Sequence, residues 1–202
     1  MSGSDKSKRI RHPVATKKIV FIGLTSALVV LIVFSVAASL SSTRHPKQSP
    51  LAQAIGVEQG GPLVGKPAPD FTLTSVNSSA EHLKLSQFVG HPVVLNFFAS
   101  WCIPCKTELP EFAAASRKES GKVDFIGVDE NDTRSAGSAI LRSSGVDFPA
   151  AFDGEGQLAS RYHLVGLPTT FFINSKGTVV AAVAGQLTTA MLNADISKII
   201  DS

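Results

Sequence analysis

Residues Pro92 to Pro110 read PVVLNFFASWCIPCKTELP and contain both cysteines of the chain. The run from Val93 to Phe98 is almost entirely apolar, which is typical of a strand buried on both faces of a sheet. The residues after Cys102 read as the start of a helix. The pattern therefore predicts that the two cysteines lie at a turn from a strand into a helix.

The spacing of Cys102 and Cys105 suits reversible disulfide chemistry. Residues i and i+3 in the first turn of a helix lie on one face, with Cα atoms roughly 5 to 6 Å apart, a separation that a disulfide tolerates. The helix N-terminus carries about half a positive charge, so it stabilises a thiolate on Cys102 and lowers its pKa from the free value of about 8.5. The sequence therefore predicts a redox-active pair.

Two other uses of a Cys-x-x-Cys motif are weaker. A zinc site needs four ligands, but the chain has no second cysteine pair and its five histidines are scattered. A disulfide that closes so short a loop removes little chain entropy, so a purely stabilising role is also disfavoured. We expect neither a metal nor a cofactor.

The N-terminal region is predicted to anchor the chain in a membrane. The chain has a formal net charge of +3, and its basic character is concentrated in residues 1–40, which hold six Lys or Arg against one acid. Nothing downstream suggests a nucleic-acid surface. The uncharged run 19–40 would span roughly 33 Å as a helix, enough for a bilayer core of about 30 Å. The basic residues before it place the N-terminus in the cytoplasm and the rest of the chain outside. Cleavage after Ala38, which would release a secreted protein, is the alternative.

These features divide the chain into four parts. They are a cytoplasmic basic tail (1–18), a transmembrane helix (19–40), a flexible tether rich in Ser, Pro, Gln and Gly (41–61) and one folded domain (62–202). Outside the cytoplasm a closed disulfide is the expected resting state of the cysteine pair unless a partner reduces it.

The folded domain is predicted to be α/β with a mixed sheet. A strand, a helix and a second strand over 93–128 require a parallel pair, because the crossover between the strands is long. Residues 129–132 are expected to form a polar loop. The other expected elements are a hairpin (71–85), helices over 102–119 with a kink at Pro110, 133–144 and 157–162, an edge strand (148–152), an antiparallel hairpin (165–184) and a closing helix (188–201) with Met191, Leu192, Ile196, Ile199 and Ile200 inward.

Four motifs taken together resemble the thioredoxin fold. They are PAPDF at 67–71, NFFASWC at 96–102, KTELP at 106–110 and GLPTT at 166–170. Over about residues 62–202 the chain is most similar to the membrane-tethered, extracytoplasmic thiol-disulfide oxidoreductases of the TlpA/ResA/DsbE group. The resemblance implies a thioredoxin-like α/β fold, with a central mixed sheet flanked by helices and an added N-terminal hairpin, preceded by one transmembrane helix.

The resemblance also implies roles for individual residues. Cys102 would be the exposed nucleophile that forms the mixed disulfide, and Cys105 would be the shielded resolving thiol. Pro168 matches the cis-proline of the family, which lies beside the cysteines and leaves Leu167 able to bind the backbone of a peptide. Trp101 would pack against the pair and shape access to it, although a core aromatic residue without a further role is equally compatible.

Glu108 is the candidate proton acceptor. Thioredoxins usually carry a buried Asp six residues before the first Cys, where this chain has Asn96, which cannot titrate. Glu108 lies at i+3 from Cys105, near enough to exchange a proton directly or through one water, and the TlpA-like group has an acid at this place. A solvated glutamate on the helix surface is the alternative.

Two related families compete with this interpretation. Peroxiredoxins share the APDFTL motif at 68–73, but they need Thr or Ser three residues before the reactive Cys and Pro seven before, where this chain has Ala99 and Leu95. Copper chaperones of the Sco type bind Cu(I) with two thiolates and a distant His, but their cysteines are one residue further apart.

The expected function is therefore extracytoplasmic thiol-disulfide exchange, with reduction of protein disulfides favoured over disulfide formation or isomerisation. The resemblance implies that the partners are apocytochrome c or other exported Cys proteins, together with a membrane thiol donor of the DsbD/CcdA kind.

Overall fold

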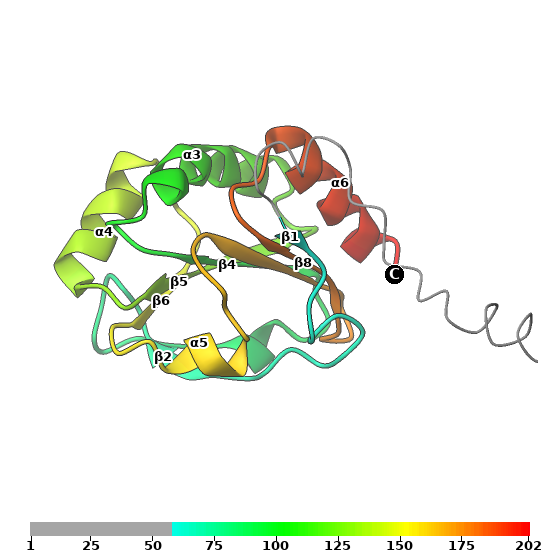
Figure 1. The fold of residues 1–202 in the computed structure, drawn as a ribbon, viewed down its shortest axis with the longest axis horizontal. Coiled ribbons are helices and arrows are strands. Elements are labelled where there is room, and N and C mark those ends of the chain that lie inside the picture. The colour runs from blue at the N-terminus through cyan, green and yellow to red at the C-terminus, as the bar shows by residue number, and fades with distance from the viewer. Residues whose placement is uncertain (1–57) are drawn as a thin grey trace, which may run out of the picture. The chain divides into compact units, whose positions relative to one another are not determined.

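The computed structural model describes residues 58–202, which form the mixed α/β fold in Figure 1. The predicted basic tail and transmembrane helix, and the predicted tether as far as residue 57, lie outside the described residues. Within residues 58–202, no helix combines the length and the apolar character that crossing a membrane requires.

Six strands form the central sheet, and the predicted mixed pairing is confirmed. In spatial order the strands are β1 (Glu58–Gln59), β8 (Val179–Ala184), β7 (Thr169–Ile173), β4 (Val93–Phe98), β5 (Asp124–Glu130) and β6 (Ala150–Asp153). β4 pairs in parallel with β5 and antiparallel with β7. The strand that precedes the cysteines is therefore central, and neighbouring strands hold it on both edges.

The two faces of the sheet are covered by different layers, as Figure 1 shows. Three helices lie over one face: α3 (Ile103–Lys118), α4 (Arg134–Ser143) and α6 (Thr189–Ile200). The opposite face carries α5 (Gln157–Arg161), the expected hairpin of β2 (Thr72–Thr74) and β3 (His82–Lys84), and a short 3-10 helix, η1 (Leu85–Phe88).

Alternation along β4 assigns its side chains to these layers. All six residues of the strand are buried. Leu95 and Phe97 pack into the core on the α5 side, where the ring of Phe97 lies 4.9 Å from that of Tyr162. Since side chains alternate between the two faces, Asn96 and Phe98 face the α3 side. The polar Asn96 is therefore directed beneath the helix that carries the cysteines.

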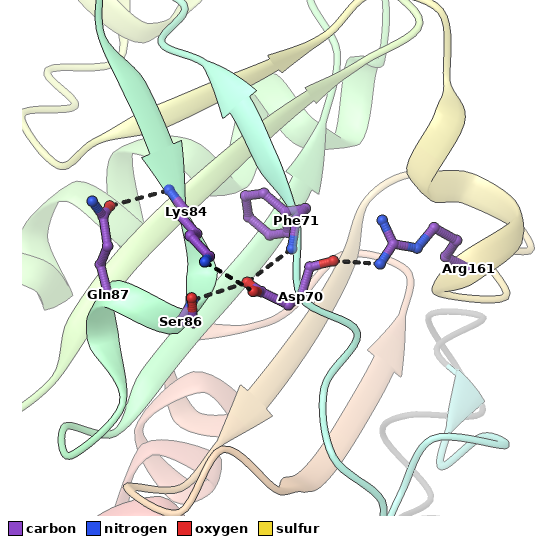
Figure 2. Close-up of polar contacts among 6 residues, drawn as sticks. All are labelled: Asp70, Phe71, Lys84, Ser86, Gln87 and Arg161. Carbon is purple, nitrogen blue, oxygen red and sulfur yellow. Dashed lines mark hydrogen bonds and ion pairs between the residues drawn. The ribbon is translucent and has the colours of Figure 1, made fainter.

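Asp70 joins the N-terminal hairpin to α5, as Figure 2 shows. Its Oδ1 accepts hydrogen bonds from the backbone N–H groups of Phe71 and Ser86, both at 3.0 Å. Arg161 donates to the backbone carbonyl of Asp70, and Lys84 Nζ lies 3.9 Å from Asp70 Oδ2. One aspartate thus fixes the start of the domain, its 3-10 helix and the short helix on the same face.

The element boundaries differ from the expected ones at several ends. Glu58 and Gln59 fall in the stretch expected to be a tether, yet they pair with Ala184 and Val183 as an edge strand. The closing helix was expected to bury Ile200, and this was wrong, because the side chain is 43% exposed. Leu192, Ile196 and Ile199 are buried and already form the i, i+4, i+7 stripe, which leaves Ile200 at its margin.

The expected polar loop over 129–132 was also partly wrong. Asp129 and Glu130 are the last two residues of β5, and both are buried, at 0% and 5% exposure. Asp129 lies under α4, where a Cβ at Gly137 would overlap its carboxyl group. The close approach of this glycine to the sheet is what accommodates an acidic side chain between β5 and α4.

Candidate active site

Cys102 and Cys105 lie at the expected turn between β4 and α3. Cys102 is the N-cap of the helix, and its sulfur accepts a hydrogen bond from the backbone N–H of Cys105 at 3.2 Å. The two residues form a disulfide with a Cα–Cα distance of 5.3 Å, as the i, i+3 spacing predicted. Cys102 is 4% exposed and Cys105 is 0% exposed. Of the two cysteines, Cys102 is therefore the more accessible to an approaching partner.

Exposed apolar side chains surround the cysteine pair. Trp101 is 58% exposed, so the alternative that it is a core aromatic was wrong, and its indole Nε1 donates to the carbonyl of Asn131 at 3.1 Å. Ile103 and Val165 are also exposed, at 75% and 76%. Together they leave an apolar rim around the redox pair, which suits contact with another polypeptide.

The predicted cis-proline is present next to this rim. The Leu167–Pro168 peptide bond is cis, and Leu167 packs against the cluster that contains both cysteines. The carbonyl of Pro168 accepts a hydrogen bond from the N–H of Gly185, which is 2.8 Å away. Within residues 58–202, neither the N–H nor the C=O of Leu167 has a hydrogen-bond partner. Both groups are thus available to the backbone of a bound peptide.

Glu108 is buried beneath the cysteines, and the solvated alternative was wrong. Its side chain is 1% exposed, Oε1 accepts from Asn96 Nδ2 at 2.9 Å and Oε2 accepts from the backbone N–H of Leu187 at 3.1 Å. Burial raises the pKa of Glu108 to about 7, although the bonds from Leu187 and Asn96 act in the opposite direction. The group can therefore gain or lose a proton near neutral pH.

Asn96 connects Glu108 to the cis-proline strand. Its Nδ2 also donates to Thr170 Oγ1 at 3.0 Å, so one amide group joins α3, β4 and β7. Its buried Oδ1 has no partner among the described residues. Because the amide is neutral, Glu108 is the titrating member of this network.

A second group of buried carboxyls, which sequence reasoning missed, lies at the ends of β5 and β6. Its members are Asp129, Glu130 and Asp153. Asp153 is satisfied, since its two oxygens accept from the N–H groups of Gln157 and Leu158 at the start of α5. Among residues 58–202, no N–H or hydroxyl group donates a hydrogen bond to either side-chain oxygen of Asp129 or to Oε2 of Glu130. The signal that could have revealed these carboxyls was the acidic run at the end of an apolar strand, but this run was interpreted as a polar loop.

Burial, together with the neighbouring carboxyls, keeps two of these side chains protonated near neutral pH. Burial, followed by the charge of Asp132, raises the pKa of Asp129 to about 8. Burial, followed by the neighbouring carboxyl of Asp153, raises the pKa of Glu130 to about 8. Asp132 differs from these two residues. Burial acts to raise its pKa, but the hydrogen bonds that it accepts from Ser100 and Thr133 outweigh the effect of burial, so the pKa of Asp132 is lowered. Asp132 Oδ2 accepts from Ser100 N at 2.6 Å, so it holds the backbone just before the cysteines.

These raised pKa values predict that the folded domain loses stability as the pH rises. A carboxyl whose pKa is higher in the folded than in the unfolded chain stabilises the fold fully below the unfolded value and loses that contribution as pH passes the folded value. The pKa of Asp129 is raised from 3.8 to about 8. This contribution is lost between those two pH values, so Asp129→Asn, which stays neutral, is expected to raise the melting temperature over the original chain by more at pH 8.5 than at pH 5.

Thermal unfolding of the oxidised protein at both pH values checks this expectation. Asp147→Asn is the matched control, because Asp147 is exposed and faces Arg117 at 3.8 Å. A difference in melting temperature between Asp129→Asn and the original chain that is the same at both pH values would contradict the burial argument.

Comparison with known proteins assigns the family. The family model described as the AhpC/TSA family matches residues 64–182, which include the cysteine pair and the cis-proline. The chain belongs to the AhpC/TSA family. Within it, the thiol-disulfide oxidoreductase ResA of Bacillus subtilis is 36% identical over 130 residues, covering 64% of this chain and 72% of the relative. ResA of Geobacillus kaustophilus is 33% identical, covering 65% of this chain and 75% of the relative.

Solved structures agree with this family membership. A thiol:disulfide interchange protein DsbE from Chlorobium tepidum superposes with a TM-score of 0.63 and 28% identity, covering 68% of this chain and 97% of that one. StoA from Bacillus subtilis superposes with a TM-score of 0.54 and 26% identity, covering 66% and 98%. The chain is thus a thiol-disulfide oxidoreductase with a thioredoxin-like fold and a Cys102–Cys105 disulfide. Among residues 58–202, no group of three or more His, Cys, Asp or Glu is placed to hold a metal ion.

Proposed function

We propose that this protein reduces disulfides of exported proteins by dithiol exchange. The observation that carries the proposal is a titratable carboxyl, that of Glu108, buried one helical turn after Cys105 and held by Asn96 and Leu187. Residues at i and i+3 on a helix are neighbours, so Glu108 lies within reach of the Cys105 thiol directly or through one water.

The reaction starts at Cys102. Its thiolate, stabilised at the N-terminus of α3, attacks one sulfur of the substrate disulfide, and the other substrate sulfur leaves as a thiolate that takes up a proton. Glu108 then accepts the proton of the Cys105 thiol. The Cys105 thiolate attacks the Cys102 sulfur, which closes the Cys102–Cys105 disulfide and releases the second substrate thiol. Two electrons pass from the dithiol to the substrate.

Substrate binding is assigned to the residues next to the pair. The free N–H and C=O of Leu167 would pair with the peptide backbone, while Pro168 sets the position of Leu167 beside the cysteines. Trp101 contributes exposed apolar surface on the other side. A single cysteine-containing segment can then lie across Cys102 in one register.

The partners follow from the predicted anchor. The uncharged run 19–40, with basic residues before it, would hold the domain at the outer face of the cell membrane, with the N-terminus in the cytoplasm. Apocytochrome c or another exported Cys protein would be the substrate. Because the reduced pair must be regenerated, a membrane thiol donor of the DsbD/CcdA kind would supply the electrons.

The reduction potential of the full-length protein tests the direction of transfer. A potential near or below about −250 mV, with little oxidative refolding of a reduced secreted protein, supports the proposal. The helix N-terminus favours the opposite direction, since a stabilised thiolate makes the pair more oxidising. A potential near about −120 mV with vigorous refolding would therefore assign the protein as a disulfide donor instead.

A further inference from the structure

A groove opens beside the redox pair, between Trp101 and Leu167. Its volume is about 270 Å³, and its lining includes Trp101, Glu130, Asn131, Leu164, Val165 and Leu167. Trp101 neighbours Cys102 in the chain, and Leu167 precedes the cis-proline. A peptide that meets Cys102 and pairs with the backbone of Leu167 therefore passes this groove, which we call the Trp101 groove.

The lining of the Trp101 groove is mostly apolar and includes one acidic residue, Glu130. Trp101 and Val165 stand exposed at the rim, whereas Glu130 is 5% exposed. No N–H or hydroxyl group among residues 58–202 donates to Glu130 Oε2, and the Glu130 side chain shares a hydrogen bond with the carboxyl of Asp153. An apolar lining beside a buried carboxyl matches a long basic side chain, whose methylene stem packs on apolar surface while its charged end reaches the acid. The exposed indole face can add a cation–π contact.

The charges around Glu130 are one-sided. Asp153 of β6 and Asp129 of its own strand both raise its pKa, and no basic group offsets them. The basic residues of the neighbouring helices are engaged elsewhere. Arg161 of α5 donates to the carbonyl of Asp70, and Arg134 of α4 lies 4.3 Å from the ring centre of Phe152 and donates to Thr74 Oγ1. The acidic residue of the groove thus lacks a cation.

We propose that the Trp101 groove is a subsite for a lysine or arginine of the substrate that lies next to the target cysteine, with Glu130 as its charge partner. This inference rests on the proposed function, since it concerns the substrate of the same exchange. Glu130 would determine which cysteines react fastest, without taking part in the exchange of sulfur.

The subsite has a defined dependence on pH. In the empty groove Glu130 has a pKa of about 8, so it is largely protonated at pH 6.5. A cation in the groove favours the carboxylate and lowers this pKa, so binding releases a proton. The preference for a basic neighbour is therefore expected to grow from pH 6.5 to pH 8.5 and to weaken with added salt.

The test uses the reduced full-length protein and two peptides that each carry one mixed disulfide and differ only in Lys or Met beside the cysteine. The rate of exchange is followed through the fluorescence of Trp101, the single tryptophan of the chain. The rates at which a small dithiol reacts with the two peptides give the intrinsic difference in reactivity between their mixed disulfides. After this correction, we expect the Lys peptide to react about tenfold faster at pH 8.5, as one neutralised buried charge implies, and less than threefold faster at pH 6.5.

The isosteric variant Glu130→Gln is expected to abolish this preference, so that it reacts with the Lys and Met peptides at rates within twofold of each other. Glu155→Gln is the matched control, because it makes the same change at an exposed acid just before α5, and it should keep the full preference. Equal rates for both peptides in the original chain, or a preference retained by Glu130→Gln, would overturn the proposal. Failure to exchange with either peptide would instead refute the proposed function. Should Glu130→Gln not fold, the pH and salt dependence of the original chain decides.

Discussion

Cys105→Ser in the full-length protein is expected to accumulate mixed disulfides between Cys102 and its partners. The first step still proceeds, because the Cys102 thiolate keeps its place at the start of α3. The second step stops, because the thiol that would attack the Cys102 sulfur is gone. Adducts should appear on non-reducing gels after thiols are blocked in acid, and they should disappear when a reductant is added.

Cys102→Ser is the matched variant for this experiment. It removes the cysteine that is 4% exposed and leaves the one that is 0% exposed, so it should form no adducts and reduce no substrate. Adducts on Cys102→Ser together with none on Cys105→Ser would reverse the assigned roles. In both variants, the rate of multiple turnover should fall to the uncatalysed rate, because a complete catalytic cycle needs both sulfurs.

The position of the cysteines was predictable because local rules determine it. An apolar run before Cys102, a proline at the first turn and the i, i+3 spacing all indicate one strand-to-helix turn, and the structure places them there. The cis bond before Pro168 was predictable only through the family resemblance, since an X–Pro bond is cis in about 5% of cases.

The buried carboxyls were not predictable from local patterns. Asp129 and Glu130 follow an apolar run and precede Asn131 and Asp132, so the four residues read as a polar loop. Their burial depends on contacts from distant parts of the chain: Gly137 lies over Asp129, and Gly156 lies beside Glu130. Hydrophobic periodicity carries no information about such contacts, because they form only after α4 and α5 pack on the sheet.

The burial of Glu108 was only half predictable. Its position at i+3 from Cys105 follows from the spacing, but a helix surface near Lys106 and Glu111 is also compatible with a solvated acid. The structure shows that the β8–α6 connection covers this side of α3, with the N–H of Leu187 donating to Glu108 Oε2 at 3.1 Å. A loop 79 residues further along the chain therefore determines the chemistry of this side chain.

Glu108→Gln is expected to slow the resolving step about 100-fold at pH 8, the lower end of what a positioned general base contributes. The carboxylate, and not the acid, accepts the proton of Cys105. Since the pKa of Glu108 is about 7, the resolving rate of the original chain should rise as pH passes through 7. Gln is nearly isosteric but cannot accept a proton, so the variant should lose this inflection.

Release of the second substrate thiol in single turnover, measured from pH 5.5 to pH 8.5, isolates the resolving step from the attack of Cys102. Glu111→Gln is the matched control, because it makes the same change one turn later on α3, at an exposed residue whose Oε2 accepts from Thr189 Oγ1 at 2.8 Å. A second readout is the reduction potential. Loss of the negative charge of Glu108 should stabilise a nearby thiolate and make the pair more oxidising at pH 8. Glu108 has no part in the proton transfer if Glu108→Gln keeps both the rate and the pH profile of Glu111→Gln.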